Sequence, residues 1–183
     1  PDVSEHPHGW NTGLSHRRKV RSYQIEAQWY QHYASHCTHD CVVPVCLAVS
    51  AGVGETVLVL SDLNAAGFDV RKSHVKTQDI HACLDWLASF HATFLNTKAD
   101  DLWECGTYWH LDTRPDELAA LKDRALRQAA PLIDQKLRDG RYQTLVHGDA
   151  KLANFCFRPD HSSLNSSNQH FPPRVAAVDF QYV

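Results

Sequence analysis

The stretch Leu145-Val-His-Gly-Asp-Ala-Lys-Leu-Ala-Asn-Phe-Cys-Phe157 decides the fold that we expect, together with the later stretch Val175-Ala-Ala-Val-Asp-Phe-Gln181. The first stretch predicts an apolar strand that runs into the triplet His-Gly-Asp at 147–149, a short turn to Asn154, and a second apolar strand. The later stretch predicts a third strand that leads to Asp179. The pattern therefore places an Asp, an Asn and a second Asp at the ends of consecutive strands.

These polar residue types suit phosphoryl transfer, in which the protein mainly positions the reactants and stabilises charge. Asp149 can accept the proton of an attacking hydroxyl, and Lys151 can place positive charge beside the transferred phosphoryl group. Asn154 and Asp179 carry oxygen ligands of the kind that Mg²⁺ prefers. The alternative interpretation is a turn between strands, in which the same side chains serve only the local backbone.

The chain resembles the aminoglycoside phosphotransferase and choline kinase superfamily, and within it the ecdysteroid kinase-like (choline kinase-like) branch. Besides the two stretches already quoted, residues 22–30 (Ser-Tyr-Gln-Ile-Glu-Ala-Gln-Trp-Tyr) and 58–63 (Leu-Val-Leu-Ser-Asp-Leu) agree with this branch. The resemblance extends over most of the chain from about Ser15 onward. Only the segments 145–157 and 175–181 are specific to the superfamily.

The resemblance implies a fold of the α+β class, the two-lobe fold of protein kinases. Residues 1–62 would form part of the N-terminal lobe up to the hinge, and residues 63–183 part of the C-terminal lobe. Gly148 stands where protein kinases have Arg, which points to small-molecule acceptors. Gln181 replaces the Gly of the protein-kinase triplet Asp-Phe-Gly, so loop flipping of the protein-kinase kind is not expected.

The resemblance also implies ATP and Mg²⁺ as cofactors and a role for each site residue. Asp149 would be the catalytic base with Lys151 assisting, and Asn154 and Asp179 would hold the metal. Glu26, on a helix, would orient a strand lysine on the nucleotide phosphates, although a solvated helix carboxylate is the alternative. The backbone of the hinge would meet the adenine at Ser61, Asp62 and Leu63. Asp62 has the alternative role of a turn residue.

We interpret the chain as an internal fragment of a longer kinase. It begins at Pro1 and contains no Met. In the resembled family, strands that grip the phosphates, one carrying a lysine, precede the helix of Glu26. Here the residues before Glu26 are polar and turn-rich, and Lys19 lies on the approach to the helix. A long helical segment that builds much of the acceptor pocket would follow the position of Val183.

Composition gives no indication of a nucleic-acid or membrane partner. The net charge is −3, from 21 acidic and 18 basic residues, so a strongly basic face is not expected. No apolar run is long enough to span a bilayer. The six cysteines show no paired framework, which is typical of reduced thiols. We therefore expect a cytoplasmic protein, and its oligomeric state stays open.

One further cluster carries zinc-capable side chains, namely residues 36–41 (His-Cys-Thr-His-Asp-Cys) with Cys46. A structural zinc site normally has two short-spaced ligand pairs separated by a longer run, and this cluster has one crowded group. We therefore favour a helix-to-strand turn here.

Apolar periodicity and turn residues predict the other elements. We expect a helix from about Ser15 to Tyr33 and a helix with an apolar stripe that includes Ile80, Leu84 and Leu87. A further helix would begin near Thr113, kink or restart at Pro131 and stop at Gly140. The remaining ranges are a hairpin of strands at 42–49 and 56–60 and a long polar loop at 158–174.

Two function classes remain in competition. The favoured one is an ATP-dependent phosphotransferase that acts on a hydroxyl of a small molecule. The alternative is a catalytically silent nucleotide-binding or scaffold protein of the same fold, which has no chemical need for the Asp149, Asn154 and Asp179 set. Choline-like, aminoglycoside-like and steroid-like acceptors all stay open.

Overall fold

The computed structural model describes residues 13–52, 55–107, 110–159 and 174–183. Over these residues the chain is a mixed α+β structure with four α-helices and two antiparallel hairpins, which confirms the expected α+β class. The helices are α1 (Gly13–His32), α2 (Thr77–Thr93), α3 (Pro115–Ala120) and α4 (Arg124–Arg138). The strands are β1 (Cys46–Gly52), β2 (Glu55–Leu60), β3 (Phe155–Phe157) and β4 (Val175–Ala177). Short 3-10 turns are η1 (Ala34–His36), η2 (Leu111–Thr113) and η3 (Leu152–Asn154).

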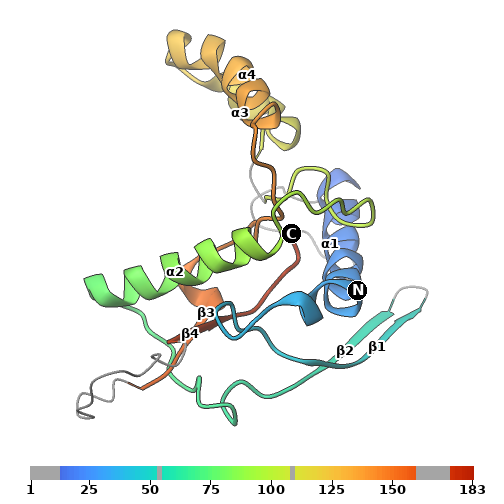
Figure 1. Ribbon diagram of the computed structural model, residues 1–183. Coiled ribbons are helices and arrows are strands. Elements are labelled where there is room, and N and C mark those ends of the chain that lie inside the picture. Colours follow the sequence, from blue (N-terminus) through green and yellow to red (C-terminus); the bar gives the residue numbers. More distant parts are fainter. Residues whose placement is uncertain (1–12, 53–54, 108–109, 160–173) are drawn as a thin grey trace.

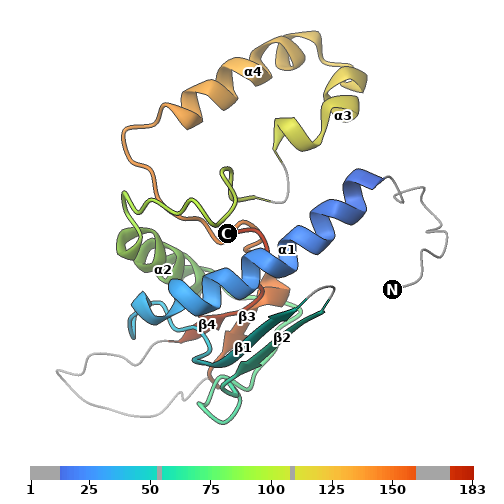
Figure 2. The ribbon, with the colours of Figure 1, turned by 90° about the vertical axis from the view of Figure 1, so that its right-hand side faces the viewer.

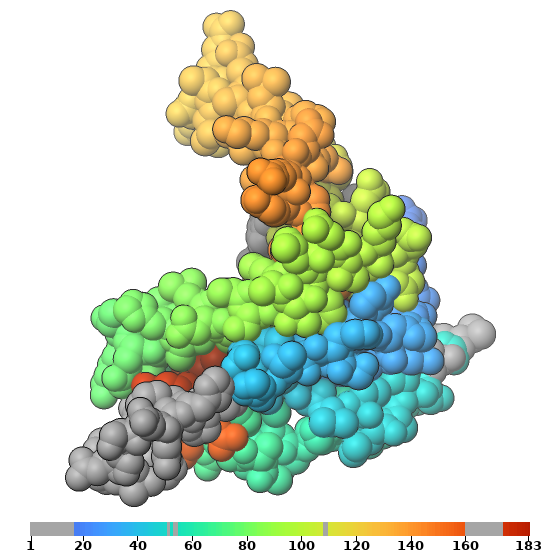
Figure 3. Space-filling view, in the orientation of Figure 1, coloured from blue at the N-terminus to red at the C-terminus, as the bar shows by residue number. Residues whose placement is uncertain are grey.

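The body of the molecule consists of two helix-on-hairpin units. Helix α1 lies alongside the β1–β2 hairpin and contacts both of its strands (Figure 2). Helix α2 lies over the β3–β4 hairpin and contacts β4 (Figure 1). Helices α3 and α4 form an arm that stands away from this body, as the space-filling view shows (Figure 3). The segments that carry the predicted site all belong to the body.

Helix α1 confirms the helix predicted from about Ser15 to Tyr33. Ser22, Ile25 and Trp29 are fully buried and follow one another at the i, i+3, i+7 spacing of a single helix face. Tyr30 is also buried, whereas Tyr23 is exposed. The indole of Trp29 has the larger apolar area, so its position sets the rotation of the helix.

Helix α2 was also predicted, but only part of the expected stripe faces the core, with Leu87 packed against it. Its buried residues include Trp86 and Phe90, whereas Ile80 and Leu84 of the expected stripe are exposed. The indole N–H of Trp86 donates to the carbonyl of Val42 at 2.9 Å, which satisfies its polar atom inside the core. Burial of two large aromatic rings outweighs that of the aliphatic stripe.

One aromatic cluster holds the body together. Phe180 lies flat on Trp29, with ring centroids 3.6 Å apart and an interplanar angle of 1°. Trp86 stacks on Phe90 at 5.0 Å and meets Phe155 of β3 edge-on at 5.9 Å. The cluster joins α1, α2 and β3 to the residue that follows Asp179, so the position of that segment depends on both helices.

The two hairpins confirm most of the strand predictions. β1 pairs antiparallel with β2 but begins at Cys46 rather than at Val42, which instead bridges Ala176 of β4. β3 pairs antiparallel with β4. The strand expected at 145–147 is wrong, because only Thr144 forms a bridge there, to Leu95, and residues 145–147 pair with no strand in the described part of the chain.

The predicted helix from Thr113 to Gly140 is two helices, since α3 ends at Ala120 and α4 starts after Asp123. Asp123 caps α4 by accepting the N–H of Leu126 at 2.9 Å. Pro131 lies inside α4 without ending it. The start of α3 at Pro115 was predicted, as was the stop near Gly140. The polar loop expected at 158–174 lies almost entirely outside the described residues.

Candidate functional site

The turn at 147–149 begins with a buried imidazole. His147 is only 1 % exposed, and its Nε2 lies 3.0 Å from the carbonyl of Val178 while its Nδ1 lies 3.4 Å from the backbone N–H of Asp149. This pattern fits a neutral ring that donates through Nε2 and accepts through Nδ1. Burial lowers the pKa of His147 against the opposing effect of its bond to Val178. His147 therefore fixes the turn at 147–149 to Val178, the residue between β4 and Asp179.

Both the backbone angle at position 148 and the atoms around it require a glycine. Its φ is +77°, in the left-handed region that side chains disfavour. A Cβ atom there would lie 1.9 Å from the carbonyl oxygen of Tyr182. The close approach brings the chain before Asp149 against the residues that follow Asp179.

Asp149, Lys151 and Asn154 form one local hydrogen-bonded group. The amide of Asn154 donates to the backbone carbonyl of Asp149 at 2.9 Å and lies 3.4 Å from its Oδ2. The ammonium of Lys151 lies 2.5 Å from the same carboxylate oxygen. Asn154 is buried and Lys151 is exposed, so the group reaches from the interior to the surface. Because the Asn154 nitrogen faces Asp149, its Oδ1 is the atom that can meet a cation.

Asn154 and Asp179 lie at the same end of the β3–β4 hairpin. The register pairs Phe155 with Ala177, so Asn154 lies just before β3 and opposite Val178. The N–H of Val178 donates to the carbonyl of Asn154 at 3.0 Å and continues the ladder. Opposed residues in an antiparallel pair lie about 5 Å apart, so the backbones of Asn154 and Asp179 are near neighbours.

Asp179 carries two unusual features. Its φ is +70°, which is uncommon for a residue with a side chain. Among the described residues, its buried Oδ1 has no hydrogen-bond partner. Strained backbone and an unsatisfied buried carboxylate oxygen are both costly, and they are found mainly where function requires them.

The residues present fit a divalent cation at this end of the hairpin. An orphaned carboxylate oxygen and a neighbouring amide oxygen are hard ligands of the type that Mg²⁺ takes, with water or phosphate completing its shell. Within the described residues, no group of three or more His, Cys, Asp or Glu side chains is arranged for a metal. The zinc-capable residues at 36–41 therefore do not form such a group.

Glu26 joins α1 to the same region. Its carboxylate accepts the backbone N–H of Phe180 at 3.1 Å. Burial and the neighbouring carboxylate of Asp179 raise the pKa of Glu26, against opposing hydrogen bonds from Gln181 and Phe180 and the charge of Lys19. The structure therefore brings Glu26 next to Asp179 across a long sequence separation.

Gln181 contacts three residues that the sequence did not single out for the site. Its Oε1 accepts from the ammonium of Lys19 at 2.9 Å and from the hydroxyl of Ser22 at 3.3 Å. Its backbone carbonyl accepts from the indole of Trp103 at 2.8 Å. Ser22 and Lys19 lie about one and two helical turns before Glu26 and so share its side of the helix. Helical spacing is therefore the signal that could have found them.

The predicted hinge is held by its neighbours. Ser61 exchanges two bonds with Val45, through its backbone N–H and through its hydroxyl oxygen, each at 2.9 Å. Asp62 accepts the N–H of Asn64 at 2.8 Å, which is the turn role that the sequence left open. Leu63 is buried in a small cluster with Cys156 of β3 and Ala176 of β4. The hinge segment therefore packs on the hairpin that positions Asn154.

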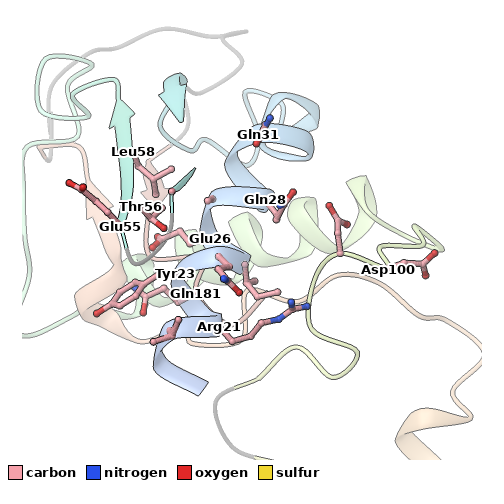
Figure 4. A pocket seen from close by; sticks show the side chains of 16 residues that line it. Arg21, Tyr23, Glu26, Gln28, Gln31, Glu55, Thr56, Leu58, Asp100 and Gln181 are labelled. Carbon is pink, nitrogen blue, oxygen red and sulfur yellow. The ribbon is translucent and has the colours of Figure 1, made fainter. Parts of the chain in front are cut away.

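A cleft of about 990 Å³ lies between α1 and the β1–β2 hairpin. Glu26 and Gln181 line it together with Tyr23 and Thr56 (Figure 4). The other predicted site residues do not line this cleft, namely Asp149, Lys151, Asn154, Asp179, Ser61, Asp62 and Leu63. The structure thus groups Asp149, Lys151 and Asn154 directly, places Asp179 beside them through the hairpin register, and leaves the hinge as a separate segment.

A comparison with known families identifies part of this chain. Residues 20–104 match the profile of the ecdysteroid kinase-like family. This segment is an ecdysteroid kinase-like domain. The family is a branch of the aminoglycoside phosphotransferase and choline kinase superfamily, and the resemblance drawn from the sequence is thereby confirmed. Searches of curated proteins and of solved structures found no match.

The ecdysteroid kinase-like domain includes most of α1, the first hairpin, the hinge segment and α2. Glu26 and residues 61–63 lie inside the matched range, while the segments 145–157 and 175–181 lie outside it. Membership in this kinase-like family implies the use of ATP and a small-molecule substrate. Among the described residues, no helix combines the length and the apolar character that crossing a bilayer requires.

Proposed function

We propose that the protein is an ATP-dependent phosphotransferase that transfers the γ-phosphate to a hydroxyl of a small molecule. The observation that carries the proposal is the grouping at the end of the β3–β4 hairpin. There the carboxylate of Asp149 lies beside Asn154. Val178 lies opposite Asn154, and the next residue is Asp179, whose carboxylate has an unsatisfied oxygen. These are the groups that phosphoryl transfer requires, in the order in which kinases supply them.

Each side chain has a role that follows from its contacts. Asp149 orients the acceptor hydroxyl and accepts its proton. Asn154 and Asp179 would hold Mg²⁺, which would offset the charge of the nucleotide phosphates. Lys151 is paired with Asp149 but exposed, so its ammonium can turn from the carboxylate toward the transferred phosphoryl group. His147 keeps the loop in place through its bond to Val178.

In this proposal the chain supplies parts of two lobes. Residues 1–62 belong to the N-terminal lobe, residues 63–183 to the C-terminal lobe, and the backbone at Ser61, Asp62 and Leu63 meets the adenine. Glu26 orients the lysine that holds the α- and β-phosphates. Its contact with the N–H of Phe180 supports this role, because it keeps the carboxylate beside Asp179.

Two substitutions separate acceptor chemistry from nucleotide binding. Asp149→Asn should abolish transfer while Mg-ATP still binds, because the base acts on the acceptor hydroxyl. Asp179→Asn should weaken Mg-ATP binding itself, because it removes a charged metal ligand. The matched control is Asp85→Asn, at an exposed position of α2. Nucleotide titration and turnover, measured over choline-like, aminoglycoside-like and steroid-like alcohols, decide between these outcomes.

Unchanged turnover in Asp149→Asn would remove Asp149 from the mechanism. Mg-ATP binding without transfer to any alcohol, in the unsubstituted protein, would favour a catalytically silent nucleotide-binding protein of the same fold.

A further inference from the structure

Two residues that stand outside the kinase pattern are in contact with each other. In that pattern a strand carries the lysine that meets the nucleotide phosphates, and a glycine follows the Asp-Phe pair. This chain has Lys19 within helix α1 and Gln181 in the position of that glycine. The ammonium of Lys19 donates to Oε1 of Gln181 at 2.9 Å, across 162 positions of the sequence. The contact joins α1 to the segment that carries Asp179.

Lys19 lies on the side of α1 that faces this segment. Lys19, Ser22 and Glu26 follow one another at the i, i+3, i+7 spacing of a single helix face. The hydroxyl of Ser22 lies 3.3 Å from the same amide oxygen, and the carboxylate of Glu26 accepts the N–H of Phe180 at 3.1 Å. This face of the helix therefore runs along the two residues that follow Asp179.

The ammonium of Lys19 is exposed and keeps its charge. Besides the amide oxygen of Gln181, it contacts the ring of Tyr23, whose centroid lies 4.7 Å from Nζ. An amide oxygen and an aromatic ring are uncharged, so neither partner cancels the positive charge. The side chain of Lys19 is exposed, so a ligand can reach the ammonium from solvent.

The neighbouring arginines of α1 make a different contact. The guanidinium groups of Arg18 and Arg21 both lie over the indole of Trp103, with Cζ 5.9 Å and 5.8 Å from the ring centroid. Lys19 differs from both, because its ammonium is held at the segment after Asp179.

A nucleotide at Asp179 would bring phosphates next to two carboxylates. The carboxylate of Glu26 accepts the N–H of Phe180, the residue that follows Asp179. Like charges at close range repel, so phosphates need cationic partners at this position. Mg²⁺ would offset part of the charge, and an ammonium held beside the same segment offsets more of it.

We propose that Lys19 binds the nucleotide phosphates from helix α1, with Gln181 as the residue that positions its ammonium. An ammonium has three N–H donors on a flexible stem, so it can keep its bond to Gln181 and donate to phosphate oxygens as well. Lys19 is additional to the lysine that Glu26 orients in the proposed function, and the inference rests on that function.

The test compares a ligand that carries phosphates with one that carries none. Binding of Mg-ATP and of adenosine to the full chain is measured by titration calorimetry. Lys19→Met should weaken Mg-ATP binding about tenfold, because a charge-assisted contact is lost, and should leave adenosine binding unchanged. Lys19→Arg keeps the positive charge and should retain most of the affinity. The matched control is Arg17→Met, which removes an exposed positive charge from the same helix and should leave both affinities unchanged.

A second pair of variants tests the positioning role of Gln181. Gln181→Met removes the acceptor oxygen but keeps a side chain of similar length. It should weaken Mg-ATP binding, and Lys19→Met should then have a smaller effect than it has in the unsubstituted protein. Additive effects of the two changes would show that Gln181 does not position Lys19.

The outcomes separate this inference from the proposed function. Unchanged Mg-ATP affinity in Lys19→Met, an equal loss in Arg17→Met, or a parallel loss of adenosine affinity would each overturn the role of Lys19 and leave the proposed function standing. Failure of the unsubstituted protein to bind Mg-ATP would instead refute the proposed function, and the inference with it.

Discussion

Replacing Gly148 by Ala tests whether the close approach in the loop before Asp149 is as tight as the structure indicates. The added methyl would lie 1.9 Å from the carbonyl oxygen of Tyr182. Ordinary contact begins near 3.4 Å, so the two backbones must separate by about 1.5 Å. Overpacking of this kind costs about 1–3 kcal/mol, and a side chain at φ +77° adds about 1–2 kcal/mol. We expect a loss of about 3 kcal/mol in the free energy of unfolding.

For a chain of this length, about 3 kcal/mol corresponds to a fall in Tm of about 6–12 °C, which calorimetry resolves readily. The control is Gly52→Ala, where the nearest neighbour of the new methyl is the carbonyl of Glu55 at 3.9 Å. That change should be neutral or slightly stabilising, because Ala restricts the unfolded chain. If Gly148→Ala and Gly52→Ala melt at the same temperature, the steric argument at Gly148 is wrong.

Three further predictions concern charged side chains. Burial raises the pKa of Glu26, so the ionisation of its carboxylate at neutral pH opposes folding. Glu26→Gln should therefore raise Tm at pH 7–8, and the gain should shrink toward pH 4. A gain in Tm that does not depend on pH would contradict this. Asp79→Asn removes the carboxylate that lies 2.6 Å from the half-buried ammonium of Lys72. It should lower the free energy of unfolding, measured in denaturant, by about 3 kcal/mol. The control Asp85→Asn, on the same helix, should leave that free energy almost unchanged. Lys151→Met should change the free energy of unfolding by less than about 1 kcal/mol, because the ion pair of Lys151 with Asp149 is exposed. The same change should strongly lower phosphoryl transfer. Turnover equal to that of the unsubstituted protein would exclude the assisting role of Lys151.

Several elements could be predicted because their signals are local. Pro115 at the start of α3 and the alternating strands of the first hairpin depend on neighbouring residues alone. The order of Asp149, Asn154 and Asp179 follows from the sequence in the same way, and the hairpin register places Asn154 and Asp179 at one end. Their proposed roles remain predictions.

What the sequence did not predict depends on contacts between distant segments. The rotation of α2 depends on Trp86, whose indole reaches Val42, and it leaves Ile80 and Leu84 of the expected stripe exposed. The segment 145–147 has the composition of a strand but pairs with no strand in the described residues. It is held instead by the hydrogen bond from His147 to the carbonyl of Val178. Pairings of this kind carry no local signal.

The stack of Phe180 on Trp29 also has a thermodynamic consequence. The cleft of Figure 4 is lined by α1, and the segment of Asp179 is attached to that helix through this stack and through the Glu26 carboxylate. A ligand that shifts α1 from within the cleft must therefore also shift Phe180 and its neighbour. Linkage then makes the effect reciprocal, so that a ligand in the cleft and the cation proposed at Asp179 would change each other's affinity by the same factor. Titrating either position in the presence of the other would measure that factor.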